Sequence, residues 1–251
     1  MSYVSVVLGD APVHYWRLTD PGGGLLHDIG SGPRRALTVV GQSTLPYTGP
    51  ISDGGSCWFD ANAGAWHFSG DVVASPFSIE CWVWRHSLRG SVEAIAYHAE
   101  ALQFTASNHV LYATFGDGNI DSGAVLSEQA WHHIIGTFGP AGGGRLYIDA
   151  IQTGPIVGYA ALASSIHTPS VGMSDAGGLF GTANIAEFAT YGVELSAAQV
   201  TNHFVAADNI ASRPVYRGLG TLPSGTGGVS TVPELNEAII GYVSKLLQNT
   251  P

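Results

Sequence analysis

The sequence predicts an all-β fold: two antiparallel sheets packed as a sandwich, followed by a short C-terminal helical extension. Apolar and polar residues alternate in many short segments, as they do in strands with one face in a core. Turn residues separate these segments at intervals of about ten residues, which suits a sandwich. The 251 residues include 34 glycines without a collagen period, and 45% are hydrophobic. Such a chain forms many tight turns and can bury a large core.

The alternating segments predict twelve strands in chain order. They cover residues 12–18, 37–40, 56–60, 66–68, 77–84, 93–97, 101–105, 110–115, 131–138, 145–149, 170–173 and 183–191. Residues 139–144 form a glycine-rich turn that joins two of these strands into a hairpin. In the strand at 77–84, one face carries Phe77, Ile79, Cys81 and Val83, and the other carries Ser78, Glu80, Trp82 and Trp84.

One short helix is predicted after the last strand. Ser196 is the expected N-cap of a helix over residues 197–204, and Gln199 completes a capping box. Residues 1–212 are expected to form one domain, and residues 213–232, rich in Gly, Pro and Ser, a linker arm. Residues 233–251 predict an amphipathic C-terminal helix that begins at Pro233. Two interpretations of this helix stay open: it packs on its own domain, or it is an oligomerisation or anchoring element.

The charge excludes several classes of partner. The net charge is −10, with nine Lys and Arg residues, so no basic stripe is available for nucleic acid or anionic lipid. The N-terminus lacks the basic start of a secretion signal, and no apolar segment is long enough to insert into a membrane. We therefore expect synthesis in a cytosol without export by the usual route. Cys57 and Cys81 lie in apolar segments and are expected to be buried thiols, although a single bridge between them stays an alternative.

Six motifs in chain order resemble the laminin-G-like jelly rolls of the concanavalin A-like lectin and glucanase superfamily. They lie at residues 15–18, 28–32, 59–61, 77–83, 131–133 with 146–150, and 185–187 with 195–200. The resemblance covers most of residues 10–207. It implies a jelly-roll sandwich that binds glycans or serves as a structural module, and only some members are enzymes.

Residues 7–18 also look like the start of jelly-roll domains in bacteriophage tail and virion surface proteins. The resemblance implies a non-catalytic structural or adhesive protein of a bacteriophage particle, such as a minor tail or surface decoration protein, that contacts host-surface glycans. Its expected location is the virion. Its expected partners are other virion proteins, or copies of itself, held through the C-terminal arm and helix. The alternative is a secreted carbohydrate-binding module or glycan-processing enzyme of the same superfamily.

The expectation of no catalysis depends on the carboxylates. Glycosidases of the superfamily carry closely spaced carboxylates on one strand, whereas Glu80 and Glu187 are each alone in their strands. His132 and His133 point to opposite faces of a strand and cannot bind one metal there. The sequence also displays no evident Ser-His-Asp constellation.

Candidate ligand-binding residues follow from the resemblance. Sugar binding by jelly rolls relies on exposed aromatic rings, for which Trp66, Trp84 and Tyr159 are the candidates. The core is expected to contain Trp16, Trp58, Trp82 and Trp131. Family members often hold calcium near an early Asp and a late Asp. Asp28 and Glu187 are the candidate calcium ligands here, while Ala186 stands where the second Asp is expected.

Overall fold

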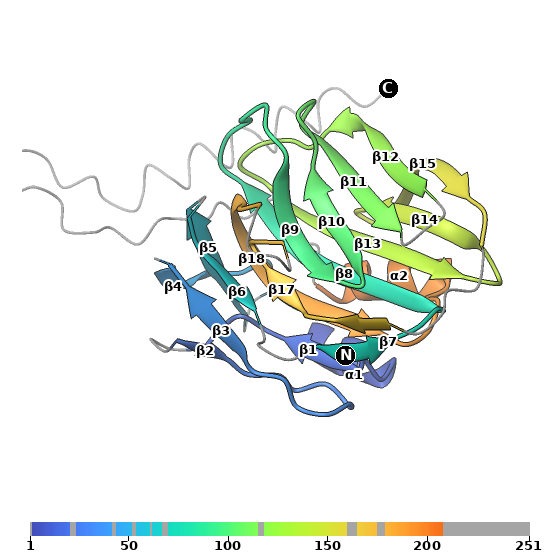
Figure 1. Cartoon of the computed structure of the whole chain (residues 1–251), viewed down its shortest axis with the longest axis horizontal. Coiled ribbons are helices and arrows are strands. Elements are labelled where there is room, and N and C mark those ends of the chain that lie inside the picture. The colour runs from blue at the N-terminus through green and yellow to red at the C-terminus, as the bar shows by residue number, and fades with distance from the viewer. Residues whose placement is uncertain are drawn as a thin grey trace, which may run out of the picture. The chain divides into compact units, whose positions relative to one another are not determined.

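The computed structural model describes residues 2–20, 24–41, 44–51, 54–60, 62–66, 70–114, 118–159, 165–174 and 179–207. Within these ranges the chain forms two eight-stranded antiparallel sheets, a two-stranded ribbon and two short helices (Figure 1). The two large sheets stack on a shared core. This architecture confirms the predicted all-β sandwich of the jelly-roll type.

Sheet A carries most of the longer strands. Its strands are β1 (His14–Trp16), β4 (Thr44–Thr48), β5 (Gly55–Asp60), β8 (Phe77–Arg85), β13 (Trp131–Gly139), β14 (Gly143–Ile148), β15 (Ile151–Val157) and β18 (Thr182–Tyr191). Their order is β15, β14, β13, β8, β18, β5 and β4, and β1 also pairs with β18. The hairpin predicted around residues 139–144 is the pair β13 and β14.

Sheet B forms the other layer. Its strands are β2 (Leu25–Leu26), β3 (Leu37–Val40), β6 (Gly64–Trp66), β9 (Glu93–His98), β10 (Glu100–Phe104), β11 (His109–Thr114), β12 (Gly118–Val125) and β17 (Ser170–Val171). Their order is β12, β11, β10, β9, β17, β6, β3 and β2. A separate ribbon pairs β7 (Asp71–Val73) with β16 (Ser165–His167).

A bulge in β18 brings the N-terminal strand into the centre of sheet A. Residues 182–185 pair with β5, and residues 188–190 pair with β1. The register changes between Ala186 and Ala189, where Glu187 has a φ of +54°. A bulge re-aims the side chain of the inserted residue. Here it directs Glu187 to the hydroxyl of Tyr15 and the guanidinium of Arg17.

The main core lies between the two sheets. Ile79, Cys81 and Val83 of β8 belong to it, while Trp82 belongs to a second apolar cluster on the outer face of sheet A. The alternation predicted for this strand is therefore confirmed. Cys57 and Cys81 are both buried free thiols, as expected. Burial raises the pKa of the Cys81 thiol, with a further contribution from the nearby Glu80 charge.

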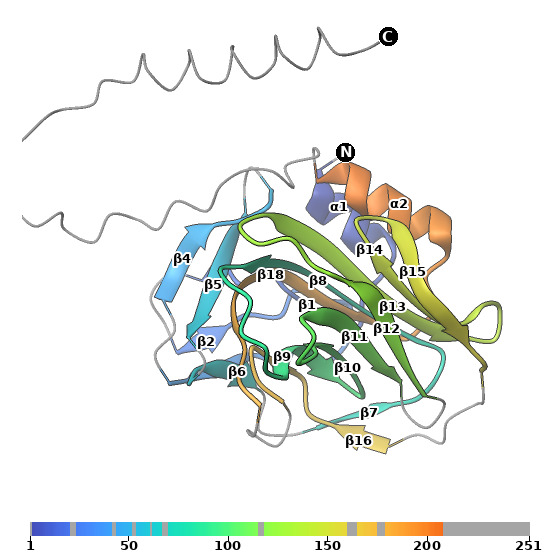
Figure 2. The same cartoon turned by 90° about the horizontal axis from the view of Figure 1, so that it is seen from above.

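Two helices cover the outer face of sheet A. Helix α1 (Tyr3–Gly9) and helix α2 (Ala197–Ala206) lie side by side over it (Figure 2). The capping box predicted for α2 is present, because Ser196 and Gln199 each bond the backbone of the other. None of the helices in the described ranges has the length and apolar character needed to cross a lipid bilayer.

A buried carboxylate holds both helices onto the sheet. Glu80 of β8 has no solvent exposure and accepts hydrogen bonds from the hydroxyls of Tyr3 in α1 and Tyr191 in β18, at 2.7 and 2.6 Å. It also contacts Nε2 of His133 at 2.7 Å and Nδ1 of His203 at 2.9 Å. His203 lies in α2, and its Nε2 is 2.8 Å from Asp10 at the end of α1. One side chain thus connects two sheet strands with both helices.

These contacts set the charges in the network. Burial alone would raise the pKa of Glu80, but attraction to His203 and hydrogen bonds from His133 and His203 hold it well below its usual value. Burial alone would lower the pKa of His203, but the Glu80 charge and hydrogen bonds to Glu80 and Asp10 raise it to about 9. The pair is therefore an ion pair near neutral pH.

Several elements differ from the sequence-based prediction. Helix α1 was not predicted, and neither were β2, β4, β7, β12, β15 and β16. The strand predicted at 66–68 corresponds to β6, which ends at Trp66. The predicted arm at 213–232 and helix at 233–251 lie outside the described residues, as does the end of the predicted domain 1–212 beyond Ala207.

Candidate functional site

The outer face of sheet B is the surface of the sandwich that no described helix covers (Figure 2). Residues directly opposite each other on antiparallel strands share a face. Across β9 to β12, one row consists of Tyr97, Ala101, Ala113 and Asn119, and the next consists of Gln103, Leu111 and Asp121. All seven are half-buried or exposed. We call these seven residues the open face.

The open face combines an aromatic ring with small and polar neighbours. Ala101 and Ala113 stand beside Tyr97 in its row. Gln103 and Asp121 supply amide and carboxylate groups one row away. Asp121 has a side chain that is 47% exposed, and its Oδ1 is 2.8 Å from Nδ1 of His109. An aromatic ring beside a few oriented polar groups is typical of ligand sites.

A second candidate site lies at one end of sheet A, where β13 begins and β14 ends. Oγ of Ser127 is 2.6 Å from Nε2 of His132, and Nδ1 of His132 is 2.7 Å from Oδ2 of Asp149. The other oxygen of Asp149 accepts the backbone N–H of His133 at 2.9 Å, which fixes the carboxylate. A nucleophile, a base and a group that orients the base stand in the order of a Ser-His-Asp triad. The sequence displays no evident constellation of this kind, and the fold brings the three side chains together.

This triad opens into a groove of about 360 Å³. Its wall includes Val125 and Ile151, whose side chains are 51% and 71% exposed. The backbone around the triad is strained, since Gln129 and Asp149 have φ angles of +55° and +52°. Strained backbone of this kind clusters at functional sites. We call this feature the Ser127 groove.

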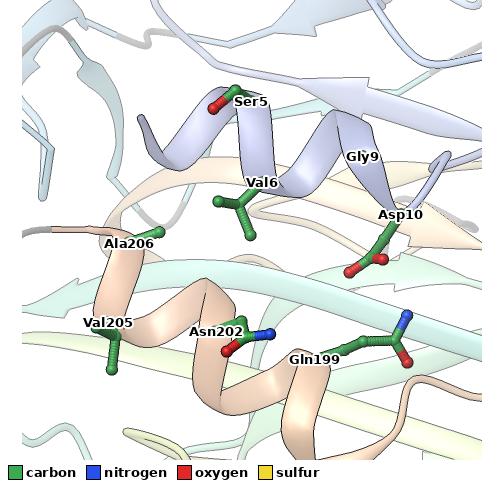
Figure 3. Close-up of a pocket in the computed structure, with 8 residues that line it drawn as sticks. All are labelled: Ser5, Val6, Gly9, Asp10, Gln199, Asn202, Val205 and Ala206. Atoms are coloured by element: carbon green, nitrogen blue, oxygen red, sulfur yellow. The ribbon is translucent and has the colours of Figure 1, made fainter. Parts of the chain in front are cut away.

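A larger groove of about 630 Å³ lies between the two helices (Figure 3). Its charged lining residue is Asp10, and one oxygen of that carboxylate already contacts His203. Gln199 and Asn202 supply amides from α2, and the rest of the lining is small or apolar. Apart from the Asp10 carboxylate, its lining residues thus offer uncharged polar groups and apolar surface.

The structure locates the predicted sugar-binding aromatics differently from the expectation. Trp84 is 3% exposed and packs edge-on against Trp131 with ring centroids 5.9 Å apart, so it offers no face to a sugar. Tyr159 is half-buried, with its ring 5.1 Å from that of Phe138. The backbone of Trp66 lies in β6 opposite Ser170, but its side chain lies outside the described part. The described contacts do not bring Trp84 and Tyr159 together.

The predicted core tryptophans largely behave as expected. Trp16, Trp82 and Trp131 are at most 1% exposed. Trp58 is only half-buried, with its ring centroid 4.3 Å from that of His86.

The predicted calcium ligands already have other partners. Burial alone would raise the pKa of Asp28, but a hydrogen bond to His14 and backbone N–H groups lower it. Glu187 accepts from Tyr15 and pairs with Arg17 at 3.2 Å. Both carboxylates therefore face donors that already compensate their charge. A calcium site at Asp28 and Glu187 stays a prediction.

Sequence inspection missed both candidate sites for a geometric reason. The open face depends on the register of four strands, and the alternation of β10 and β11 is its only trace in the sequence. His132 and Asp149 belong to family-like motifs, whereas Ser127 carries no motif of its own. Only the fold brings the Ser127 hydroxyl to the imidazole of His132.

The stacked antiparallel sheets and the open face define the class of protein as a lectin-like β-sandwich. A laminin-G-type family model, described as the Concanavalin A-like lectin/glucanases superfamily, matches residues 55–201, which is more than half of the chain. The chain therefore belongs to this superfamily. No curated protein matches it by sequence.

Several solved structures share the fold. Trypanosoma rangeli sialidase in complex with sialic acid matches 81% of this chain with 13% identity and a TM-score of 0.59, and the match covers 34% of the sialidase. Domain 4 of an extracellular arabinanase from Geobacillus stearothermophilus, in complex with arabinotriose, matches 76% of this chain and 97% of its own, with 14% identity and a TM-score of 0.54. A structure of botulinum neurotoxin type C, whose cell entry is dependent upon interaction with two ganglioside molecules, matches 81% of this chain and 53% of its own, with 12% identity and a TM-score of 0.57.

These similarities show the fold and correct one prediction. The chain spans about a third of the length of the sialidases it matches. The prediction that the protein is not an enzyme is overturned, because its structural neighbours include sialidases and a domain of an arabinanase. Membership in this fold therefore gives no ground for excluding catalysis.

Proposed function

We propose that this protein recognises glycans through the open face of sheet B. The observation that carries the proposal is the row of Tyr97, Ala101, Ala113 and Asn119, in which an aromatic ring stands beside small side chains and an amide. In the proposed complex a pyranose ring stacks on Tyr97, beside the small side chains of Ala101 and Ala113, while Gln103 and Asp121 bond its hydroxyls. Structural neighbours solved with sialic acid and arabinotriose support the same class of ligand.

The test is binding of the full chain to an array of bacterial surface glycans, followed by calorimetry on the best ligand. Tyr97→Ala should weaken binding by at least about tenfold, which corresponds to roughly 1.4 kcal/mol. Tyr159→Ala, at an aromatic residue outside the open face, is the matched variant and should bind as the wild type does. Equal binding by Tyr97→Ala and wild type, or loss only in Tyr159→Ala, would remove the open face from the proposal.

We further propose that recognition occurs on a bacteriophage particle, where the protein is a minor tail or surface decoration protein. The motif at residues 7–18 and the net charge of −10 support this setting. Residues 213–251 are the proposed attachment to other virion proteins or to copies of the same chain. Mass spectrometry of purified particles should detect the protein. Deletion of residues 213–251 should reduce the molar mass measured by light scattering to that of one chain, and an unchanged mass would contradict this attachment.

The Ser127 groove supports a second candidate function, hydrolysis of an ester such as an acylated glycan. Ser127 Oγ would attack the carbonyl carbon while His132 Nε2 takes the hydroxyl proton, and Asp149 would stabilise the imidazolium. The alcohol would leave with that proton, and water would then release the acid and restore Ser127. The exposed Val125 and Ile151 suit an acyl chain.

Covalent labelling tests this chemistry directly. A fluorophosphonate probe should label the wild type at Ser127, and Ser127→Ala should abolish the label. Ser107→Ala, at another exposed serine, is the control and should label normally. Absence of label on the wild type, or label that persists in Ser127→Ala, would leave the triad a structural hydrogen-bond chain.

A further inference from the structure

Three side chains from three different sheets converge in the sandwich. They are His14 of β1 in sheet A, Asp71 of β7 in the ribbon, and His98 of β9 in sheet B. Nε2 of His14 is 3.2 Å from Oδ2 of Asp71, and Nε2 of His98 is 4.0 Å from the same oxygen. All three atoms lie within 4.8 Å of one another. The imidazoles are almost fully buried, and the Asp71 side chain is 11% exposed.

None of these three atoms has a hydrogen-bond partner among the residues that the structure describes. His14 Nδ1 is 2.7 Å from the Asp28 carboxylate, so we assign the ring proton to Nδ1 and a lone pair to Nε2. We assign the same tautomer to His98, whose Nδ1 is 3.4 Å from the hydroxyl oxygen of Thr190 and can donate to it. Two imidazole lone pairs and a carboxylate oxygen therefore face one another without a donor. Such a buried arrangement is unfavourable unless a cation lies between the atoms.

Each of the three side chains also has a second polar partner that orients it. Asp28 orients His14, and Thr190 orients His98. Arg35 Nε is 2.6 Å from the other oxygen of Asp71. Partners of this kind orient metal ligands and fix the tautomers of histidines.

We propose that His14, Asp71 and His98 bind a divalent transition-metal ion, with zinc as the preferred ion. Imidazole nitrogens with one carboxylate oxygen suit zinc, whereas calcium prefers oxygen ligands alone. Bonds of about 2.0–2.2 Å in a tetrahedral site place the ligand atoms about 3.3 Å apart. The spacing of His14 from Asp71 already matches, and His98 needs to move by about 1 Å. A cavity of about 70 Å³ beside Asp71 and His98 has room for a water as a further ligand.

The metal would crosslink three parts of the fold. Its ligands come from sheet A, sheet B and the ribbon, so one ion would join elements that are separate in their hydrogen bonding. Binding to the folded chain alone stabilises that state by mass action. The proposed role is structural and does not depend on glycan binding or on the Ser127 groove.

Metal content and spectroscopy test the site on the full chain. After chelator treatment, wild-type protein should take up one zinc per chain by elemental analysis, and its melting temperature should rise with added zinc. Cobalt bound in place of zinc should give the visible absorption bands of a four-coordinate site. Asp71→Asn and His98→Gln should each lose stoichiometric zinc, and Asp28→Asn should weaken zinc binding by about 10–100-fold.

The matched control is His27→Gln, which removes an exposed histidine paired with Asp20. This variant should bind zinc as the wild type does. Circular dichroism should show that Asp71→Asn, which keeps the shape of the side chain, remains folded. A wild type that takes up no stoichiometric zinc overturns the proposal, and so do folded ligand variants that bind zinc with unchanged affinity.

Discussion

At the scale of single residues, Glu80 shows how a charge is accommodated in an apolar interior. Its two oxygens receive two tyrosine hydroxyls and contact two imidazoles. An unpaired carboxylate at this position would be strongly unfavourable. With these partners it remains ionised and fixes the positions of side chains from four elements. The network explains why β8 can bury its single carboxylate.

Replacement of Glu80 should therefore be costly. Glu80→Gln keeps the shape but removes the charge that His203 faces, so we expect the free energy of unfolding to fall by about 3 kcal/mol. Urea denaturation followed by circular dichroism measures the change. Glu128→Gln, at an exposed carboxylate that accepts the backbone N–H of Leu88, should change stability by less than about 0.5 kcal/mol. Equal effects of the two substitutions would contradict the role of the network.

The same network predicts a dependence of stability on pH. The pKa of His203 is about 9 in the folded protein, above the value near 6.5 of a free histidine. The protonated side chain therefore stabilises the fold fully below pH ~6.5, and this contribution is lost as the pH rises through about 9. The loss is at most about 3 kcal/mol.

Urea titrations at pH 6 and pH 9.5 measure this loss as the difference between wild type and His203→Gln. That difference should shrink at the higher pH, and His27→Gln should follow the wild type at both. A difference that does not depend on pH would argue against a protonated His203.

At the scale of elements, the two helices are stabilised by their N-terminal caps as well as by the packing of their faces on sheet A. Helix α2 has ten residues and begins at a complete capping box. Helix α1 has seven residues, and its N-cap Ser2 accepts from the backbone N–H of Ser5. Helices this short are not stable alone, so their packing on sheet A and their caps supply the stability.

The capping box gives a direct prediction. Ser196→Ala removes the acceptor for the Gln199 backbone N–H and should lower the free energy of unfolding by about 1 kcal/mol. Thr201→Ala lies on the exposed surface of the same helix and should change it by less than about 0.5 kcal/mol. Thermal unfolding of both variants measures the contrast. A neutral effect of Ser196→Ala would mean that packing alone holds the start of α2.

At the scale of the whole molecule, the two sheets meet closely where glycine allows it. A Cβ added to Gly136 in β13 would lie 2.4 Å from the Tyr112 ring in β11 of the opposite sheet. The ring and the strand therefore occupy the space that a larger residue would need. The two sheets can approach this closely because Gly136 has no side chain.

Gly136→Ala should destabilise the sandwich by about 1–3 kcal/mol, because overpacking forces the strands or the ring to move. Gly158→Ala is the matched substitution, since no atom of the described residues lies within 4 Å of its added Cβ. Melting temperatures of the two variants should differ clearly. Similar melting temperatures would indicate that the sheets separate locally without cost.

The sequence predicted the sandwich but neither of its candidate sites, and the cause is the range of the contacts. The strand at 77–84 displays its alternation locally, and the capping box at Ser196 lies within four residues. Helix α1 escaped notice because its anchor is a contact between Tyr3 and Glu80, 77 positions apart. His14, Asp71 and His98 are likewise far apart in the chain, so no spacing rule connects them.

The location of both helices on one side has a practical consequence for display. Met1 precedes α1 and Ala207 follows α2, and both helices cover sheet A (Figure 2). A tether, tag or immobilising support joined next to either helix would leave from the side that carries them. The opposite layer, which carries the open face, would then point toward whatever the anchored molecule encounters.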